Sequence, residues 1–193
     1  GMAIVMTDRF LIAHMVGIAD AGIYTVGAQI GMAIGLIEDS FTRAWVPWVF
    51  DKLSSNDLAQ KTKIVKFTYC YNILILLMAL LLALVTPMLF RSFLGRDFLG
   101  AGVYVVWIAL GYAFNGMYKM VANYIFYVKK TYILAWVTFI TAIINIFLSY
   151  YLIKLNGALG AAQGTMFAFF FSYIFTWILS AKVYKMPWAL KIN

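Results

Sequence analysis

Charged side chains are scarce in this sequence. Of its 193 residues only 11% are Asp, Glu, Lys or Arg, while 65% are hydrophobic. Soluble globular domains carry about 25% charged residues, so the composition excludes an ordinary soluble domain. We therefore expect an integral membrane protein, in which most side chains contact lipid or one another.

Residue types that build catalytic and metal centres are also rare. The sequence has one cysteine, Cys70, and one histidine, His14. A lone cysteine excludes an internal disulfide, and Cys70 has no Cys or His neighbour at metal-ligand spacing. The sequence has no Ser/His/Asp arrangement and no glycine-rich phosphate loop. We expect no enzyme activity, no metal, no cofactor and no nucleic-acid partner.

Apolar runs of membrane length are what the sequence does have. Crossing a hydrocarbon core of roughly 30 Å takes about 20 apolar residues in a helix. The runs predict an all-α fold, a polytopic transmembrane bundle of about six helices that forms one unit over residues 1–193. The predicted helices are 2–16, 22–50, 64–90, 102–128, 132–153 and 159–181, with a polar linker at 51–63 and a basic tail at 182–193. The third helix has no polar side chain over 73–85 apart from a methionine sulfur, so we expect it to face lipid.

The first segment, 2–16, is short. Fifteen residues rise only about 23 Å at 1.5 Å per residue, less than the core thickness of roughly 30 Å. We expect that the beginning of this helix is missing. The alternative is that Met2 is the first residue of the protein and that the helix is short or half-buried.

Helix 22–50 combines close-packing residues with ionisable ones. Gly27, Gly31 and Gly35 recur every four residues and form a smooth stripe along which another helix can approach. One to three turns later stand Glu38, Asp39 and Arg43. Charges inside a membrane cost at least about 2.5 kcal/mol each on insertion scales and are functional by default. We expect the other helices to pack around this one, and Pro47 to kink or end it.

Helix 102–128 carries a polar stripe of its own. Gly111, Asn115, Lys119 and Asn123 follow one another at steps of four residues and share a face. Counted from the same membrane face, Lys119 lies about 26 Å along its helix, and residues 38–43 lie about 24–32 Å along theirs. This matching depth predicts one polar zone between the two helices. Arg9, about 10 Å along the first segment, indicates a second polar zone.

Two interpretations of the charged residues stay open. Asp39 precedes Arg43 by four residues, the favourable order for a structural ion pair on one helix. Alternatively, Arg43 binds a phosphate through its bidentate fork, together with Lys119, which has no acid within reach on its own helix. The Asn side chains are either interhelical hydrogen-bond partners or substrate ligands.

The distribution of lysine and arginine predicts the orientation. If 51–66, 127–131 and 182–193 lie on one side, that side holds nine cations and the opposite side three. The nine are Lys52, Lys61, Lys63, Lys66, Lys129, Lys130, Lys182, Lys185 and Lys191, and the three are Arg91, Arg96 and Lys154. Because cytoplasmic loops are enriched in Lys and Arg, the first side and the C-terminus are predicted to be cytoplasmic.

Several short motifs, in order, resemble one family. They are Asp8-Arg-Phe10, Ala21-Gly-Ile-Tyr24, Phe41-Thr-Arg-Ala-Trp-Val-Pro47, Asn123-Tyr-Ile-Phe-Tyr-Val-Lys-Lys-Thr131, Ile143-Ile-Asn145-Ile and Gly157-Ala-Leu-Gly-Ala-Ala162. Together they resemble the carboxy-terminal half of bacterial polysaccharide flippases, which move O-antigen or exopolysaccharide repeat units and belong to the multidrug/oligosaccharidyl-lipid/polysaccharide, MATE-like superfamily. Family members have about twelve helices in two halves. One departure is Ser149, which stands where the resemblance leads us to expect a second Asn four residues after Asn145.

The resemblance implies a function and its residues. It implies a fragment of a transporter that flips a polyprenyl-pyrophosphate-linked oligosaccharide across the bacterial inner membrane by alternating access, coupled to an ion gradient. The implied partners are membrane lipid, the missing amino-terminal half and polysaccharide polymerase machinery. The candidate substrate-binding residues are Arg9, Arg43, Lys119, Asn115 and Asn123, and the candidate ion-coupling residues, for a proton or Na⁺, are Asp8, Glu38 and Asp39. The alternatives are a multidrug cation antiporter of the same superfamily and a non-transporting scaffold for polysaccharide assembly.

Overall fold

The computed structural model describes residues 2–55, 57–91 and 100–189 and is all-helical over them. The helices are α1 Met2–Met15, α2 Ile18–Gly31, α3 Ala33–Ser54, α4 Leu58–Leu89, α5 Gly102–Tyr127, α6 Tyr132–Asn156 and α7 Ala158–Val183. Only Met32 separates α2 from α3, and its backbone is itself helical, so the two run as one 37-residue helix. The prediction of an all-α bundle of about six helices is confirmed.

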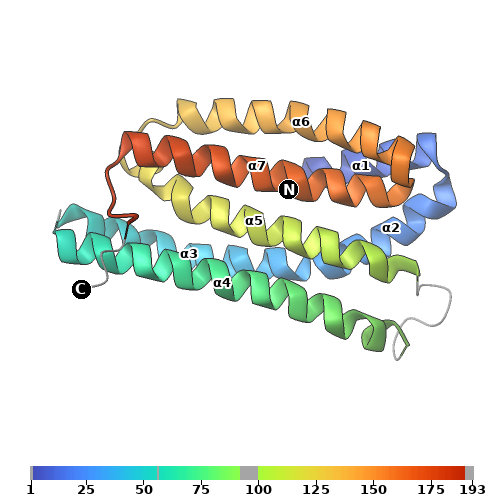
Figure 1. The fold of residues 1–193 in the computed structure, drawn as a ribbon, viewed down its shortest axis with the longest axis horizontal. Coiled ribbons are helices and arrows are strands. Elements are labelled where there is room, and N and C mark those ends of the chain that lie inside the picture. The colour runs from blue at the N-terminus through green and yellow to red at the C-terminus, as the bar shows by residue number, and fades with distance from the viewer. Residues whose placement is uncertain (1, 56, 92–99, 190–193) are drawn as a thin grey trace.

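Helix α5 lies at the centre of the bundle (Figure 1). It packs against α7, α4, α3 and α2, and both of its flanks are buried over most of its length. The expectation that helix 22–50 is the centre is wrong. One face of α3 stays exposed along Leu36, Ile37 and Phe41. The expectation relied on the charged residues of this helix, and intramembrane charge indicates a polar surface rather than the helix with the most neighbours.

The stripe of Gly27, Gly31 and Gly35 packs closely against another helix, α5, as predicted. A Cβ on Gly27 would lie 2.5 Å from the Ala101 carbonyl oxygen, and one on Gly31 would lie 2.7 Å from the Ile108 Cβ. Gly35 faces the ring of Tyr112 in the same way, one turn further on. The three glycines therefore let α2 and α3 approach α5 to backbone contact.

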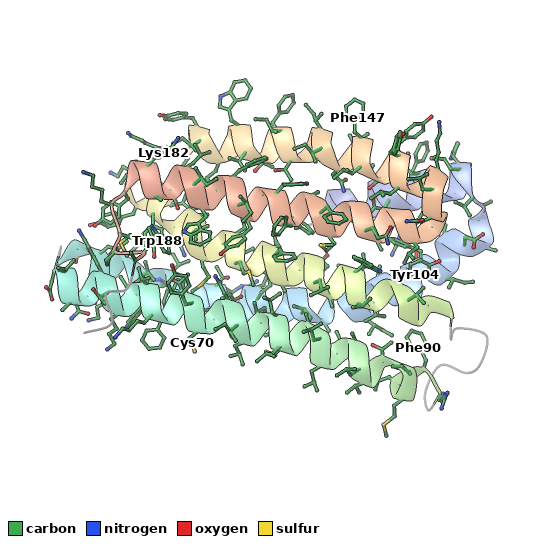
Figure 2. All side chains as sticks on the ribbon, viewed as in Figure 1. Cys70, Phe90, Tyr104, Phe147, Lys182 and Trp188 are labelled. Carbon is green, nitrogen blue, oxygen red and sulfur yellow. The ribbon has the colours of Figure 1, made fainter. Side chains whose placement is uncertain are left out.

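Four described helical runs are long and apolar enough to cross a membrane: Ile18–Ser54, Leu58–Leu89, Tyr132–Asn156 and Ala158–Val183. The outward faces of α4 and α6 are apolar, and Figure 2 shows Phe147 on α6 pointing away from the bundle. From residue 73 to residue 88 of α4, the large exposed apolar residues are Ile73, Leu74, Leu77, Leu80, Leu81, Leu84, Val85 and Met88. Such a surface suits lipid, as the prediction for this helix requires.

Several helix ends differ from the sequence-based expectations. Helix α3 passes through Pro47 and continues to Ser54, and α4 begins at Leu58, so most of the predicted linker 51–63 is helical. The Asp57 carboxylate accepts a hydrogen bond from the Ala59 N–H at 3.1 Å and caps α4, a local signal that outweighs the polarity of the segment. At the other membrane face, Gly157 with φ of 61° makes the predicted turn between α6 and α7.

The C-terminal segment is placed differently from the sequence-based expectation. Residues 184–189 fold back onto the bundle, where Trp188 packs edge-on against Tyr124 and its carbonyl accepts a hydrogen bond from the Tyr69 hydroxyl at 3.0 Å (Figure 2). The predicted basic tail is therefore packed against the bundle as far as Ala189, and we call residues 184–189 the strap. The α3–α4 link, the α5–α6 turn and this strap share one end of the bundle, as the orientation prediction requires (Figure 1). Arg96 and Lys191, counted in that prediction, lie outside the described residues.

Candidate functional site

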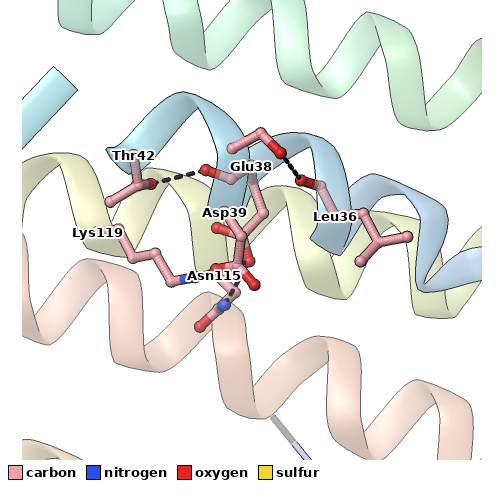
Figure 3. Close-up of polar contacts among 7 residues, drawn as sticks. Leu36, Glu38, Asp39, Thr42, Asn115 and Lys119 are labelled. Atoms are coloured by element: carbon pink, nitrogen blue, oxygen red, sulfur yellow. Dashed lines mark hydrogen bonds and ion pairs between the residues drawn. The ribbon is translucent and has the colours of Figure 1, made fainter. Parts of the chain in front are cut away.

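An ion cluster joins α3 to α5 (Figure 3). The Lys119 ammonium lies 3.2 Å from Glu38 Oε1 and also donates to Asp39 Oδ1. Asn115, one turn before Lys119, donates to Glu38 Oε1 at 2.6 Å. The prediction that Lys119 and residues 38–43 lie at one depth is therefore confirmed.

The two acids of this cluster differ in their surroundings. The Glu38 side chain is 1% exposed, whereas that of Asp39 is 56% exposed. A buried carboxylate needs a counter-charge and hydrogen bonds, and Lys119 with Asn115 provides both. The structural interpretation in which Asp39 pairs with Arg43 is wrong, since the partner of Asp39 comes from the neighbouring helix. Lys119 likewise has two acids, although neither stands on α5.

Two cavities open on either side of Lys119. The first, about 600 Å³, is lined mainly by apolar side chains: Thr42, Val46, Phe50, Tyr118, Lys119, Ala122, Asn123 and Phe126. The second, about 550 Å³, is more polar and is lined by Gln29, Met32, Gly35, Leu36, Glu38, Asp39, Tyr112, Asn115 and Lys119. Both lie between α3 and α5 and share Lys119, so we call them together the α3/α5 groove. Lys119 stands at the boundary between its apolar and its polar part.

Arg43 is the second cation beside the groove. Leu36, Asp39, Arg43, Val46 and Phe50 follow one another at steps of three and four residues, which places them on one face of α3. The other four line the groove, two in each part. Arg43 is exposed and makes no ion pair within the described residues, so its guanidinium is available to a ligand.

Asn123 also belongs to the groove. It lies one turn beyond Lys119 on α5 and is 4% exposed, and its Nδ2 has no hydrogen-bond partner within the described residues. Asn115, in contrast, is an interhelical hydrogen-bond partner. Of the predicted substrate-binding residues, the structure brings Asn115, Lys119 and Asn123 into the groove and sets Arg43 beside it.

A second polar cluster surrounds Asp8, on the other side of the bundle. The fully buried Asp8 carboxylate accepts hydrogen bonds from the hydroxyls of Tyr24 at 2.9 Å, Thr165 at 2.6 Å and Ser149 at 3.2 Å. These donors come from α2, α7 and α6. Asn145 donates to Thr165 at 3.3 Å and completes the cluster. No cation among the described residues forms an ion pair with Asp8.

Sequence reasoning found Asp8 but not its partners. Asn145 and Ser149 stand four residues apart, and the resemblance leads us to expect an amide where Ser149 stands. The signal that sequence reasoning missed is Gly164. A Cβ at this position would lie 2.6 Å from Ser149 Oγ. Because glycine has no Cβ, α7 can bring Thr165 to the carboxylate. Arg9, predicted to bind substrate, is half-buried next to this cluster, and its Nε has no hydrogen-bond partner within the described residues.

These two clusters have different chemistry. Asp8 is a carboxylate among neutral hydroxyl donors, an environment that accepts a proton or a small cation. Glu38 and Asp39 already hold the Lys119 ammonium. The described residues contain no group of three or more His, Cys, Asp or Glu side chains that would hold a metal ion.

Two curated proteins of Haemophilus influenzae are similar to the chain. An "Uncharacterized membrane protein" is 32% identical over 127 residues, which cover 64% of this chain and 30% of that protein. The chain is a multi-pass membrane protein. The second relative, "Lsg locus putative protein 1", is 23% identical over 139 residues, covering 72% of this chain and 34% of that protein. The match thus spans about a third of each relative. No protein-family model and no solved structure matches the chain.

Proposed function

We propose that the chain is part of a flippase that moves a lipid-linked anionic oligosaccharide across the bacterial inner membrane, with its C-terminus in the cytoplasm. The observation that carries the proposal is the α3/α5 groove, which has Lys119 inside it. Beside the groove stands Arg43, which forms no ion pair within the described residues. Arg binds phosphate oxygens through a planar fork and Lys as a point charge, so the pair suits a pyrophosphate. Such cations are costly within a membrane unless they serve a substrate or a partner.

The two parts of the groove also suit such a substrate. The polar part offers carboxylate and amide groups of Asp39, Asn115 and Gln29, which can hydrogen-bond sugar hydroxyls. The apolar part next to Lys119 suits hydrocarbon. A cationic drug would instead meet Lys119 and Arg43, which favours the anion over the antiporter alternative. The open groove beside the charges disfavours a purely structural scaffold.

Asp8 supports coupling to an ion gradient. A buried carboxylate that accepts three hydroxyl hydrogen bonds and forms no ion pair within the described residues is a suitable site for a proton or Na⁺. Its donors stand on α2, α6 and α7, so occupancy of the site changes the forces between these helices. In this proposal Asp8 binds the driving ion, while the groove binds the substrate together with the remainder of the transporter and delivers it to the polymerase machinery.

Deletion of the gene in its host tests the proposal. We expect surface glycan to be lost and lipid-linked oligosaccharide to accumulate at the cytoplasmic face, and the wild-type gene to restore export. Lys119→Gln and Asp8→Asn should fail to restore export at normal protein levels. Lys154→Gln is the matched control, because Lys154 is exposed and lies over the Tyr150 ring at 4.4 Å, away from the groove. Normal surface glycan after deletion would contradict the proposal.

A further inference from the structure

Glu38 is only half satisfied by its partners. Its Oε1 accepts from Asn115 and Lys119, whereas its buried Oε2 has no hydrogen-bond partner within the described residues. The hydroxyl of Tyr71, on α4, is also buried and unpaired. A buried polar atom without a partner destabilises the state in which it is found, so this arrangement favours a change of state.

Both unpaired oxygens lie over Gly116, and no hydrogen bond joins them. The position that a Cβ on Gly116 would occupy is 2.6 Å from the Tyr71 hydroxyl oxygen and 3.2 Å from Glu38 Oε2. A proton taken from water onto Oε2 would form an O–H bond and remove the buried negative charge. The neutral acid then needs no counter-charge, so Glu38 no longer depends on Lys119.

The same proton changes the environment of Lys119. The titratable and charged groups facing Glu38 are Asp39 on its own helix, Tyr71 on α4, and Tyr112 and Lys119 on α5. Lys119 is thus held by two carboxylates, of which only Glu38 is buried. Once Glu38 is neutral, the ammonium keeps one partner, the half-exposed Asp39, and exposed ion pairs are weak. Lys119 is then available to an anion in either part of the groove.

We propose that Glu38, Asp39 and Lys119 form an exchange site in which a proton bound by Glu38 releases Lys119 to a phosphate group in the α3/α5 groove. This inference rests on the proposed function and adds the regulation of that site. Glu38 is the titrating residue, Lys119 the ligand-binding residue, and Asp39 holds the ammonium while the groove is empty. The linkage is reciprocal, so a bound phosphate must also raise the proton occupancy of Glu38.

Pyrophosphate binding to the 193-residue chain in phosphatidylcholine nanodiscs, measured by calorimetry, tests the exchange. Glu38→Gln imitates the protonated acid, because its amide is neutral and its oxygen can still accept from Asn115. At about pH 8 we expect this variant to bind pyrophosphate about fivefold or more tightly than wild type, the lower end of typical coupling between sites. Toward about pH 4, near the ordinary pKa of a glutamate carboxyl, the two affinities should converge. The ratio of the two cancels the titration of pyrophosphate itself.

Two further variants interpret the result. Lys119→Gln should abolish the gain that Glu38→Gln gives. The double variant should therefore bind pyrophosphate no more tightly than Lys119→Gln alone, and thermal unfolding should show that both of these variants are folded. Asp51→Asn is the charge-matched control, since Asp51 pairs with Lys52 at 3.4 Å near the end of α3 and should leave binding unchanged. Equal affinities of wild type and Glu38→Gln at about pH 8, or an equal gain in Asp51→Asn, would overturn the exchange site and leave the proposed function standing. Absence of pyrophosphate binding by every variant at both pH values would contradict both.

Discussion

Replacing the glycines between α2 and α5 by alanine tests the packing on which the groove depends. Gly22 and Gly27 stand on the same helix, yet a Cβ meets nothing within 4 Å at Gly22 and the Ala101 carbonyl oxygen at 2.5 Å at Gly27. That oxygen belongs to the backbone at the start of α5, so it cannot rotate away. We expect Gly27→Ala to force the two helices apart and Gly22→Ala to be harmless.

The magnitudes follow from two opposing effects. In a helix interior, alanine is favoured over glycine by about 1 kcal/mol, and this gain applies at both positions. Overpacking costs about 1–3 kcal/mol, with the upper end expected where the neighbour is rigid. Gly22→Ala should therefore stabilise by up to about 1 kcal/mol and Gly27→Ala should destabilise by about 2 kcal/mol. Gly35→Ala should fall between them, because its closest neighbour, 2.7 Å away, is a ring carbon of Tyr112 that can move.

Unfolding of the three variants in mixed micelles, followed by tryptophan fluorescence and circular dichroism, gives these free energies. The order of stability should be Gly22→Ala, then Gly35→Ala, then Gly27→Ala. If Gly27→Ala proved as stable as Gly22→Ala, the close approach of α2 to α5 would be wrong, and with it the position of α3 beside Lys119.

Two further predictions concern the ion cluster and the orientation. In a double-mutant cycle, Asp39→Asn and Lys119→Met should couple by about 0.5–1 kcal/mol, as expected for a partly exposed ion pair. Asp39→Asn and Arg43→Met should be additive within about 0.5 kcal/mol, and strong coupling there would restore the same-helix pair. In a cysteine-free background, an impermeant thiol reagent added to intact cells should label Gly100→Cys and not Ser55→Cys. The opposite labelling would invert the predicted orientation.

Helical pattern and length were enough to predict the fold class, the lipid-facing side of α4 and the glycine contact. These features depend on residues within one helix, and their spacing can be read along the chain. The central position of α5 was not predicted, because it depends on how many other helices surround it. The helical start of α4 was missed for a different reason: the residues before Ile64 are mostly polar and carry no apolar helical pattern, and the Asp57 cap begins the helix among them.

Partners across helices were the part of the site that could not be predicted. Spacing along α3 suggested that Asp39 pairs with Arg43, four residues away, whereas the structure pairs it with Lys119, eighty residues away. Spacing does not report the rotation of one helix about its axis relative to the next. Depth does carry over between helices, since it depends only on rise per residue, and the depth comparison correctly placed Lys119 beside residues 38–43.

The cross-helix partners also decide what each buried acid can do. Asp8 and Glu38 are both fully buried carboxylates and look alike in the sequence. Among the described residues, Asp8 accepts hydrogen bonds from neutral hydroxyls and forms no ion pair, so an ion from outside can supply its counter-charge. Glu38 has a fixed counter-ion in Lys119, so a proton there changes the availability of that lysine. In the proposed flippase, an ion at Asp8 would therefore act on the packing of α2, α6 and α7, and a proton at Glu38 would act on the groove. Because α5 packs against both α2 and α3, a transporter built on this bundle has a continuous helix that connects the two sites.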